Sequence, residues 1–485
     1  MTASAPQTDH LSRRAWGALL VLCGALFLDA LDVSMIGVAL PSIRTDLHMS
    51  TSSLQWVVSA YVLGYGGFLL LGGRAADLLG RRRVFLISLG VFIAASAFGG
   101  FANDGTLLIV ARFVKGVSAA FTAPAGLSII TTTFAEGPAR NKALSVYTAT
   151  GATGFSIGLV FGGLLTAIGW RWVFFLPAPL ALIALVAGLR LVPHSARVRA
   201  SRAFDVTGAV TMTGGMLLLV YTLVEAPQAG WASGRTLGSF AAAAAIFAAF
   251  VVRERHAEFP LVRLGILRSG ALVRANLAAM ALFGGWVGFQ FIATLYLQQL
   301  RGWSALQTGL AIFPAGMLVA VISPRIAFLV MRFGVTRLIV AGMTSIAAAY
   351  ALFLPIGLDS GYVTAMLPTF LLAGLGFAFA FGPLNIAGTN GVAAEEQGLA
   401  GGLLNTSFQF GGALVLAIVS AVISANAGAG GSPQAVLDGF HAGIYVSVGA
   451  ALLGVSAMVL QRSQRTEVVL VEDDELLEEV LEEAA

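Results

Sequence analysis

Apolar stretches long enough to cross a membrane recur along almost the whole chain, separated by short polar connections. A helix needs about 20 apolar residues to span the hydrocarbon core of a bilayer. The pattern predicts fourteen such helices, near residues 16–40, 54–72, 84–102, 106–131, 143–168, 172–192, 206–224, 236–252, 271–298, 306–330, 336–355, 362–384, 400–424 and 441–460. We therefore expect an all-α integral membrane protein without a separate soluble domain.

The composition points to lipid as the solvent of this chain. Of the 485 residues, 58% are hydrophobic and 11% are charged, whereas a soluble domain carries about a quarter charged residues. The single cysteine, Cys23, excludes an internal disulfide. The five histidines lack metal-ligand spacing, so we expect no metal site. The first apolar run lacks a small-residue cleavage site, and we interpret it as a retained helix.

Positive charge is distributed unevenly between alternate connections. If the N-terminus is cytoplasmic, most of the 28 Lys and Arg residues fall in cytoplasmic connections, and the exceptions are Arg44, Arg171, Arg235 and Arg301. Such a bias orients membrane helices. It predicts an even helix count, with both termini cytoplasmic in a bacterial inner membrane. It also explains the net charge of +4 without nucleic-acid binding.

Two similar turns suggest an internal repeat. The sequences from Asp77 to Arg83 and from Arg332 to Arg337 both combine Gly and Arg in a short connection. Repeated halves are common in secondary transporters. We expect a cytoplasmic tail at 1–15, a six-helix bundle at 16–192, a two-helix insert with flanking loops at 193–270, a second six-helix bundle at 271–460 and an acidic cytoplasmic tail at 461–485.

The first of these turns carries the most specific motif in the chain. Its glycines permit a tight turn and close helix approach, and an aspartate there can pair with an arginine. We predict a cytoplasmic gate in which this charged motif holds one conformation, formed by Gly73, Arg74, Asp77, Gly80, Arg81 and Arg82.

This motif resembles the signature loop of the major facilitator superfamily, and further motifs resemble its fourteen-helix drug:proton antiporter branch. They begin at Leu31, Gln55, Arg112, Gly169, Phe204, Tyr296, Gly302 and Gly398. The resemblance covers about residues 15–460. It implies two six-helix bundles plus a two-helix insert, alternating access, and a central cavity lined by the first and fourth helices.

The chain departs from the family pattern in three places. The fifth-helix motif keeps its glycines, Gly154, Gly158, Gly162 and Gly163, but has Leu159 where the family has proline. The glycines permit tight packing, while the missing proline removes a kink. Lys115 replaces the usual glutamine of the fourth helix, and Pro177 replaces an asparagine.

Four charges fall inside predicted membrane helices, where charge is costly and is a functional candidate. Asp29 and Asp32 share one face of the first helix, and Arg112 and Lys115 share one face of the fourth. At 1.5 Å per residue, Asp32 and Lys115 both lie roughly 12 Å from the same end of their helices. Two carboxylates can therefore meet two cations at one level.

Burial disfavours an ionised carboxylate and a nearby cation favours it, so such a site can alternate between proton-bound and salt-bridged states. We predict Asp32 as the main proton carrier and Arg112 as its partner. Asp29 is a second carrier or a substrate contact, and Lys115 tunes both. A static ion pair that only orients the helices is the alternative.

Aromatic and amide side chains in later helices suit a large amphipathic cargo in a mostly apolar cavity. The substrate candidates are Trp286, Gln290, Tyr296, Asn385, Asn405 and Gln409. Hydrogen bonding between helices explains each of them equally well.

These features favour a monomeric proton-driven exporter of organic compounds, with a small-molecule substrate, protons and the lipid bilayer as its partners. No cofactor is expected, because the proton gradient would drive transport. Uptake or uniport of a smaller solute is the alternative within transport, since the missing proline weakens the case for antiport. A membrane-embedded enzyme is disfavoured because no nucleophile–base set or diphosphate motif is present. A sensor or scaffold would tolerate loss of the buried charges.

Overall fold

The computed structural model describes residues 13–134, 138–193, 205–257, 260, 264–390, 392, 397–426 and 432–459. All regular secondary structure in these ranges is helical. The first group of helices is α1 (Arg13–Asp46), α2 (Thr51–Leu79), α3 (Arg81–Gly100), α4 (Gly105–Thr133), α5 (Pro138–Ile168), α6 (Trp172–Phe175) and α7 (Pro177–Leu191). The middle group is α8 (Val206–Ala229), α9 (Gly234–His256) and the 3-10 helix η1 (Leu264–Arg268).

The last group begins with α10 (Gly270–Leu295), which continues as the π-helix η2 (Tyr296–Leu300). It then contains α11 (Ala305–Ile322), the 3-10 helix η3 (Ser323–Arg325), α12 (Ile326–Phe333), α13 (Val335–Phe353), the π-helix η4 (Tyr362–Met366), α14 (Leu367–Thr389), α15 (Gln397–Asn426) and α16 (Pro433–Val459). The predicted helix at 306–330 is therefore interrupted, because a 3-10 turn that contains Pro324 separates α11 from α12.

Twelve helical segments of the described chain are long and apolar enough to cross a membrane, so the protein is an all-helical, multi-span membrane protein. The predicted segments 54–72 and 206–224 fall within α2 and α8, which are not among those twelve. The acidic tail predicted at 461–485 and most of the tail at 1–15 lie outside the described residues.

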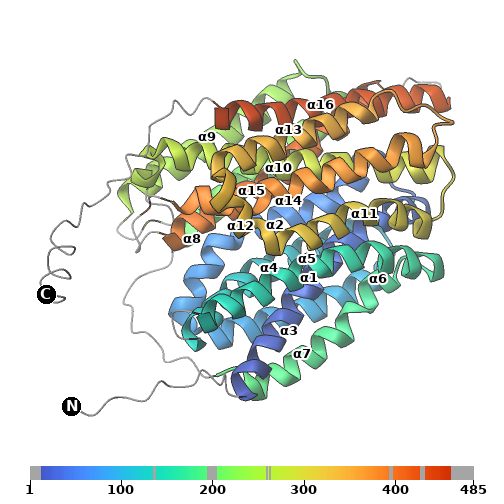
Figure 1. Ribbon diagram of the computed structural model, residues 1–485. Helices are drawn as coiled ribbons and strands as arrows, with labels where there is room; N and C mark the ends of the chain where they lie inside the picture. Colours follow the sequence, from blue (N-terminus) through green and yellow to red (C-terminus); the bar gives the residue numbers. More distant parts are fainter. Residues whose placement is uncertain are drawn as a thin grey trace, which may run out of the picture.

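The helices form two groups that face each other along their length (Figure 1). In the first, α1 packs on α5 and α2 packs on α4; in the second, α10 packs on α15 and α16, and α13 packs on α14. The two groups meet mainly where α2 contacts α15 and where α5 contacts α11. Helix α8 packs on α9 and also touches both α2 and α15, so it lies beside one of these seams.

Three of the four predicted exceptions to the charge pattern gather at one end of the molecule. Arg171 pairs with Asp46 at 2.7 Å, while Arg44 donates to Gln299 at 3.0 Å and Arg301 donates to the carbonyl of Ser360. We call this the Arg44 end. The opposite, or Arg82, end is where Arg82 donates to the carbonyl of Leu189 in α7. The structure thus confirms that Arg44, Arg171 and Arg301 lie together.

The first and last described helices run in opposite directions, which fits an even number of crossings. Helix α1 ends at the Arg44 end. Helix α16 begins there, because His441 near its start contacts the carbonyl of Ile356, which directly precedes the Arg301 network. Helix α16 therefore ends at the Arg82 end, where α1 begins.

The two predicted repeat turns have matching backbone geometry. Gly80, between α2 and α3, has φ 96°, and Gly334, between α12 and α13, has φ 83°. Residues with a Cβ rarely adopt this conformation. At both turns, glycine therefore lets the chain reverse direction between two helices with no intervening loop, as the sequence predicted.

The glycines of α5 bring it against two neighbours. A Cβ at Gly158 would lie 2.7 Å from the carbonyl oxygen of Leu31, and one at Gly162 would lie 2.8 Å from the Cα of Met35. Gly154 meets the backbone of Phe27 in the same way, while Gly163 meets α11. The predicted tight packing is confirmed, and α5 runs without interruption through Leu159.

A test of this packing compares two glycines in helices. We expect Gly158→Ala to destabilise the protein by about 1–3 kcal/mol, because its methyl group would force α1 and α5 apart. Gly90 has no neighbour near its added Cβ, so Gly90→Ala should be neutral or stabilise by up to ~1 kcal/mol through helix propensity. Thermal unfolding of the detergent-purified protein measures both, and equal melting temperatures for the two variants would contradict the close contact.

Candidate functional site

A group of charged side chains is buried where α1, α2 and α4 meet. Arg112 Nη1 lies 2.5 Å from Asp32 Oδ2, and Lys115 Nζ donates to Asp32 Oδ1. The side chains of all three are at most 1% exposed. The predicted match in depth between helices one and four is therefore confirmed. The predicted Asp32–Arg112 pair is present, and Lys115 binds the same carboxylate instead of lying between Asp29 and Asp32.

Each cation has further contacts that compensate its removal from water. Arg112 also donates from Nε to the carbonyl of Val57 at 2.9 Å, and its guanidinium lies 4.5 Å from the ring centroid of Tyr61. Lys115 Nζ lies 4.6 Å from the ring centroid of Phe92 and 5.3 Å from that of Phe174. Desolvated cation–π contacts contribute about 2 kcal/mol each. The aromatic faces thus replace part of the stabilisation that hydration would give these cations.

Asp29 lies one turn earlier on α1 and has a different environment. It accepts a hydrogen bond from the Tyr61 hydroxyl, and it makes no ion pair among the described residues. Its side chain is half-buried, whereas Asp32 is fully buried. The two predicted carboxylates are therefore not equivalent.

Tyr61 connects the two carboxylates and was missed as a site residue. Its ring lies beneath Arg112, which binds Asp32, and its hydroxyl binds Asp29. It is 1% exposed. The sequence did contain a sign of this role: Tyr61 places a phenol within an apolar helix, and a buried Tyr hydroxyl requires a hydrogen-bond partner. Tyr61 lies in the motif that begins at Gln55, but the resemblance did not assign it a role.

Close contact between α2 and α4 brings this group together. A Cβ at Gly116 would overlap the carbonyl oxygen of Tyr61, and a Cβ at Gly72 would overlap that of Ala120. The backbones therefore touch at two places that directly follow Lys115 on α4. This is the small-residue packing that the glycine content predicted, and it holds Tyr61 against the helix that carries both cations.

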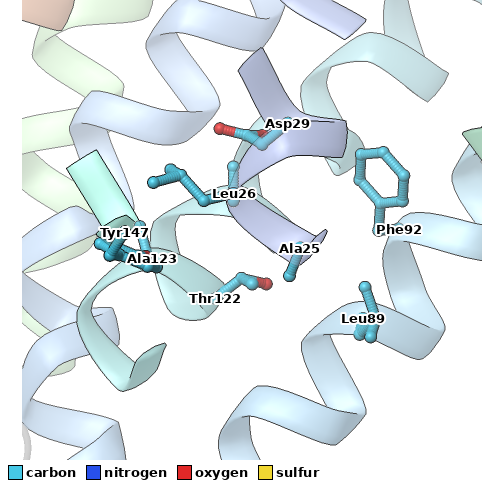
Figure 2. A pocket seen from close by; sticks show the side chains of 9 residues that line it. Ala25, Leu26, Asp29, Leu89, Phe92, Thr122, Ala123 and Tyr147 are labelled. Atoms are coloured by element: carbon cyan, nitrogen blue, oxygen red, sulfur yellow. The ribbon is translucent and has the colours of Figure 1, made fainter. Parts of the chain in front are cut away.

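A small pocket reaches Asp29 from the side facing the start of α1. Figure 2 shows Asp29 at one edge of it, with Phe92 and Tyr147 on opposite sides. It has room for about one water molecule. It is lined by Ala25, Leu26, Asp29, Leu89, Phe92, Ala119, Thr122, Ala123 and Tyr147.

The gate motif is only partly described. Gly73 lies in α2, where an added Cβ would make an ordinary van der Waals contact with Pro124 of α4. Gly80 forms the turn between α2 and α3. Arg81 donates to the carbonyl of Ser128 and Arg82 to that of Leu189, so both bind neighbouring helices of the first group. The side chains of Arg74 and Asp77 are not among those that the structure describes. The charged latch stays a prediction.

The six predicted substrate residues do not form one group. Tyr296 is buried and donates to the carbonyl of Gly357 in the Arg44-end network. Asn385 and Asn405 donate to carbonyls of their own helices. Gln290 faces Gly37 of α1 and Gln409 faces Gly66 of α2, so these two lie at contacts between the helix groups.

Trp286 belongs to an aromatic cluster that crosses between the groups. Its ring centroid lies 4.9 Å from Phe377 of α14 and 6.3 Å from Phe155 of α5. The cluster continues from Phe377 to Phe381 and Phe408. Sequence reasoning missed these phenylalanines, although the i, i+4 spacing of Phe377 and Phe381 places them on one helix face.

Charges that are buried between membrane-crossing helices are costly and mark a candidate functional site. Residues 22–416 match the profile of the Major Facilitator Superfamily. The chain belongs to this family, as the sequence motifs predicted.

Similar sequences agree with this assignment over most of their length. The chain is 38% identical to the puromycin resistance protein pur8 of Streptomyces alboniger, covering 90% of this chain and 89% of that protein. It is 35% identical to the cephamycin export protein CmcT of Amycolatopsis lactamdurans, covering 91% of each.

Solved structures share the fold at low sequence identity. A POT family transporter bound to a thioalcohol-conjugated peptide superposes with a TM-score of 0.69 at 13% identity, covering 91% of this chain and 95% of that one. A mutant of the nucleoside transporter NupG gives 0.66 at 13% identity, covering 91% and 99%. These matches support the fold alone.

The role of Asp32 as the shared partner of both cations can be tested by stability. Asp32→Asn leaves two buried cations without an anion, so we expect a loss of about 3–5 kcal/mol. Lys115→Gln keeps the Asp32–Arg112 pair and should cost less. Thermal unfolding in detergent, followed by tryptophan fluorescence, compares them. A larger loss for Lys115→Gln than for Asp32→Asn would refute this description of the group.

Proposed function

We propose that the protein exports amphipathic organic compounds, such as drugs, antibiotics or secondary metabolites, by proton-driven alternating access. The observation that carries this proposal is the buried group of two carboxylates and two cations inside the membrane-spanning part. Each intramembrane charge is costly to insert, so four of them in one group favour a function over a purely structural role.

The relatives support export as the direction of transport. Two of them are named for puromycin resistance and cephamycin export, and a third, from Streptomyces glaucescens, for tetracenomycin C resistance and export at 33% identity. These compounds differ in shape, so the names favour a class of organic compounds over one cargo. The aromatic cluster around Trp286 offers an apolar surface between the helix groups for such compounds.

The predicted architecture fits this function. We propose fourteen membrane helices, with α2 and α8 joining the twelve segments already identified. They form bundles at 16–192 and 271–460 and an insert at 193–270. Both termini are cytoplasmic in a bacterial cell membrane, so the Arg82 end faces the cytoplasm and the Arg44 end faces outward. The protein acts as a monomer.

In this arrangement the buried group couples transport to protons, with Asp29 and Asp32 as the acids, Arg112 as partner and Lys115 as a tuning charge. The gate motif from Gly73 to Arg82 stabilises one conformation at the cytoplasmic end. Substrate contacts come from Trp286, Gln290 and Gln409, which lie at the contacts between helix groups.

Uptake or uniport of a smaller solute is the competing function. Leu159 favours it, because α5 lacks the proline of the family motif and runs straight through this position. Paired intramembrane carboxylates favour proton-coupled export, and relatives named for resistance favour it further.

Puromycin is a suitable probe, and its accumulation in a susceptible bacterial host tests the proposal. Expression should lower accumulation several-fold, and a protonophore should abolish the difference, because export then lacks its driving force. The double variant Asp29→Asn/Asp32→Asn should accumulate puromycin as the empty host does. Tyr445→Phe, at an exposed position on α16, is the matched control and should behave as the wild type.

The same assay separates the alternatives. Raised accumulation on expression would favour uptake. Lowered accumulation that survives the protonophore would contradict proton coupling, and no change with puromycin, cephamycin or tetracenomycin C would contradict export of this class of compound.

A further inference from the structure

We infer that the exchangeable proton of this site is carried by Asp29, while Asp32 stays ionised as the permanent counter-ion of Arg112 and Lys115. The inference rests on the proposed proton coupling. It gives Asp29 the role that sequence reasoning had given to Asp32, and it follows from the contacts of the two carboxylates.

Protonation of Asp32 would be unfavourable on charge grounds. Both of its oxygens receive a cation, Arg112 on one and Lys115 on the other, in a site without exposure to solvent. A neutral Asp32 would leave two positive charges in contact with no anion. Removing one partner from a buried ion pair costs several kcal/mol, and here one proton would remove the partner of two cations.

Protonation of Asp29 has no such consequence. Its direct partner is the neutral Tyr61 hydroxyl, which can donate to the carboxylate and can accept from the protonated acid. The Asp32–Arg112–Lys115 triad keeps its contacts in both states. The proton therefore leaves an Asp29 oxygen, and the net charge of the four-residue group changes between +1 and zero.

The groups facing Asp29 come from four helices. Helix α1 contributes Asp32, and α4 contributes Arg112 and Lys115. Helix α2 contributes Tyr61 and Tyr65, and α5 contributes Tyr147. The charged neighbours sum to one positive charge while Asp32 is ionised. This positive charge stabilises ionised Asp29 and offsets part of the cost of burying a carboxylate.

A water-sized pocket adjoins Asp29 on one side. The pocket in Figure 2 is lined by Ala25 and Leu26, which precede Asp29 on α1, and by Thr122 and Ala123, which follow Lys115 on α4. Both pairs lie toward the Arg82 end. The pocket has room for about one water molecule, so it can accommodate a proton acceptor for Asp29 but not an organic compound. Asp32 does not line it.

Lys115 decides the division of roles. Without it, Asp32 would face Arg112 alone and the group would lose one positive charge. Each carboxylate would then hold a proton more easily. The lysine at a position where the family usually has glutamine thus fixes Asp32 as the ionised partner and leaves Asp29 to exchange.

Infrared difference spectroscopy of the full-length protein in lipid nanodiscs tests the assignment directly. Titration with pH should reveal a protonated-carboxyl band that is absent from Asp29→Asn. Asp29→Glu should restore a titrating band at an altered frequency, which separates loss of the carboxyl from misfolding. If Asp29→Asn keeps the wild-type band and Asp32→Asn abolishes it, the assignment is overturned.

Three further variants test the electrostatics, and one of them should shift the midpoint in the opposite direction from the other two. Asp32→Asn should keep the Asp29 band and move its midpoint to lower pH by about one unit or more, because two uncompensated cations then favour ionised Asp29. Lys115→Gln should move the midpoint to higher pH. Tyr61→Phe, which keeps the ring but removes the donor, should also raise it. A midpoint unchanged in all three would contradict the inference.

This readout needs no cargo, so it is separable from export. If the Asp29 band titrates as expected while puromycin accumulation is unaffected by expression, the proton site stands and the proposed cargo class fails. If export depends on the proton gradient but the titrating band belongs to Asp32, the proposed function stands and this inference fails.

Discussion

An ionised side chain in the hydrocarbon core must find its counter-charge within the protein, and this requirement organises the interior around Asp32. Arg112 and Lys115 both bind that carboxylate, and aromatic rings cover the remaining faces of the cations. The arrangement needs α1, α2 and α4 in close contact. Glycines at the α2–α4 crossing provide it by letting the two backbones touch. Packing and electrostatics therefore depend on one another at this level of the membrane.

The same group gives the molecule a chemical asymmetry along α1. Asp32 is enclosed by cations, whereas Asp29, one turn away, meets a phenol and a water-sized pocket. Tyr61 contacts both environments, since its ring supports Arg112 and its hydroxyl binds Asp29. A change at either carboxylate therefore reaches the other through one side chain. Coupling of this kind needs no large movement at the site itself.

The contacts between the two helix groups lie along α2–α15 and α5–α11. The glycines of α5 hold α1 on one side and, through Gly163, meet α11 on the other. Helix α5 thus links the helix that carries the carboxylates to the second group. With Leu159 in place of proline, α5 continues as one helix between these two contacts.

The sequence by itself determined the membrane class, the helical segments, the Gly80 and Gly334 turns and the equal depth of the charges on helices one and four. These follow from local properties: apolar length, charge distribution, glycine backbone freedom and a fixed rise per residue. It could not decide which carboxylate takes which cation, because that choice depends on how α1 and α4 are rotated against α2. Nor could it separate Tyr296, bound in the Arg44-end network, from Trp286 at the contact between the groups. Tertiary structure decided both, since helix rotation and the choice of neighbours arise from packing over the whole bundle.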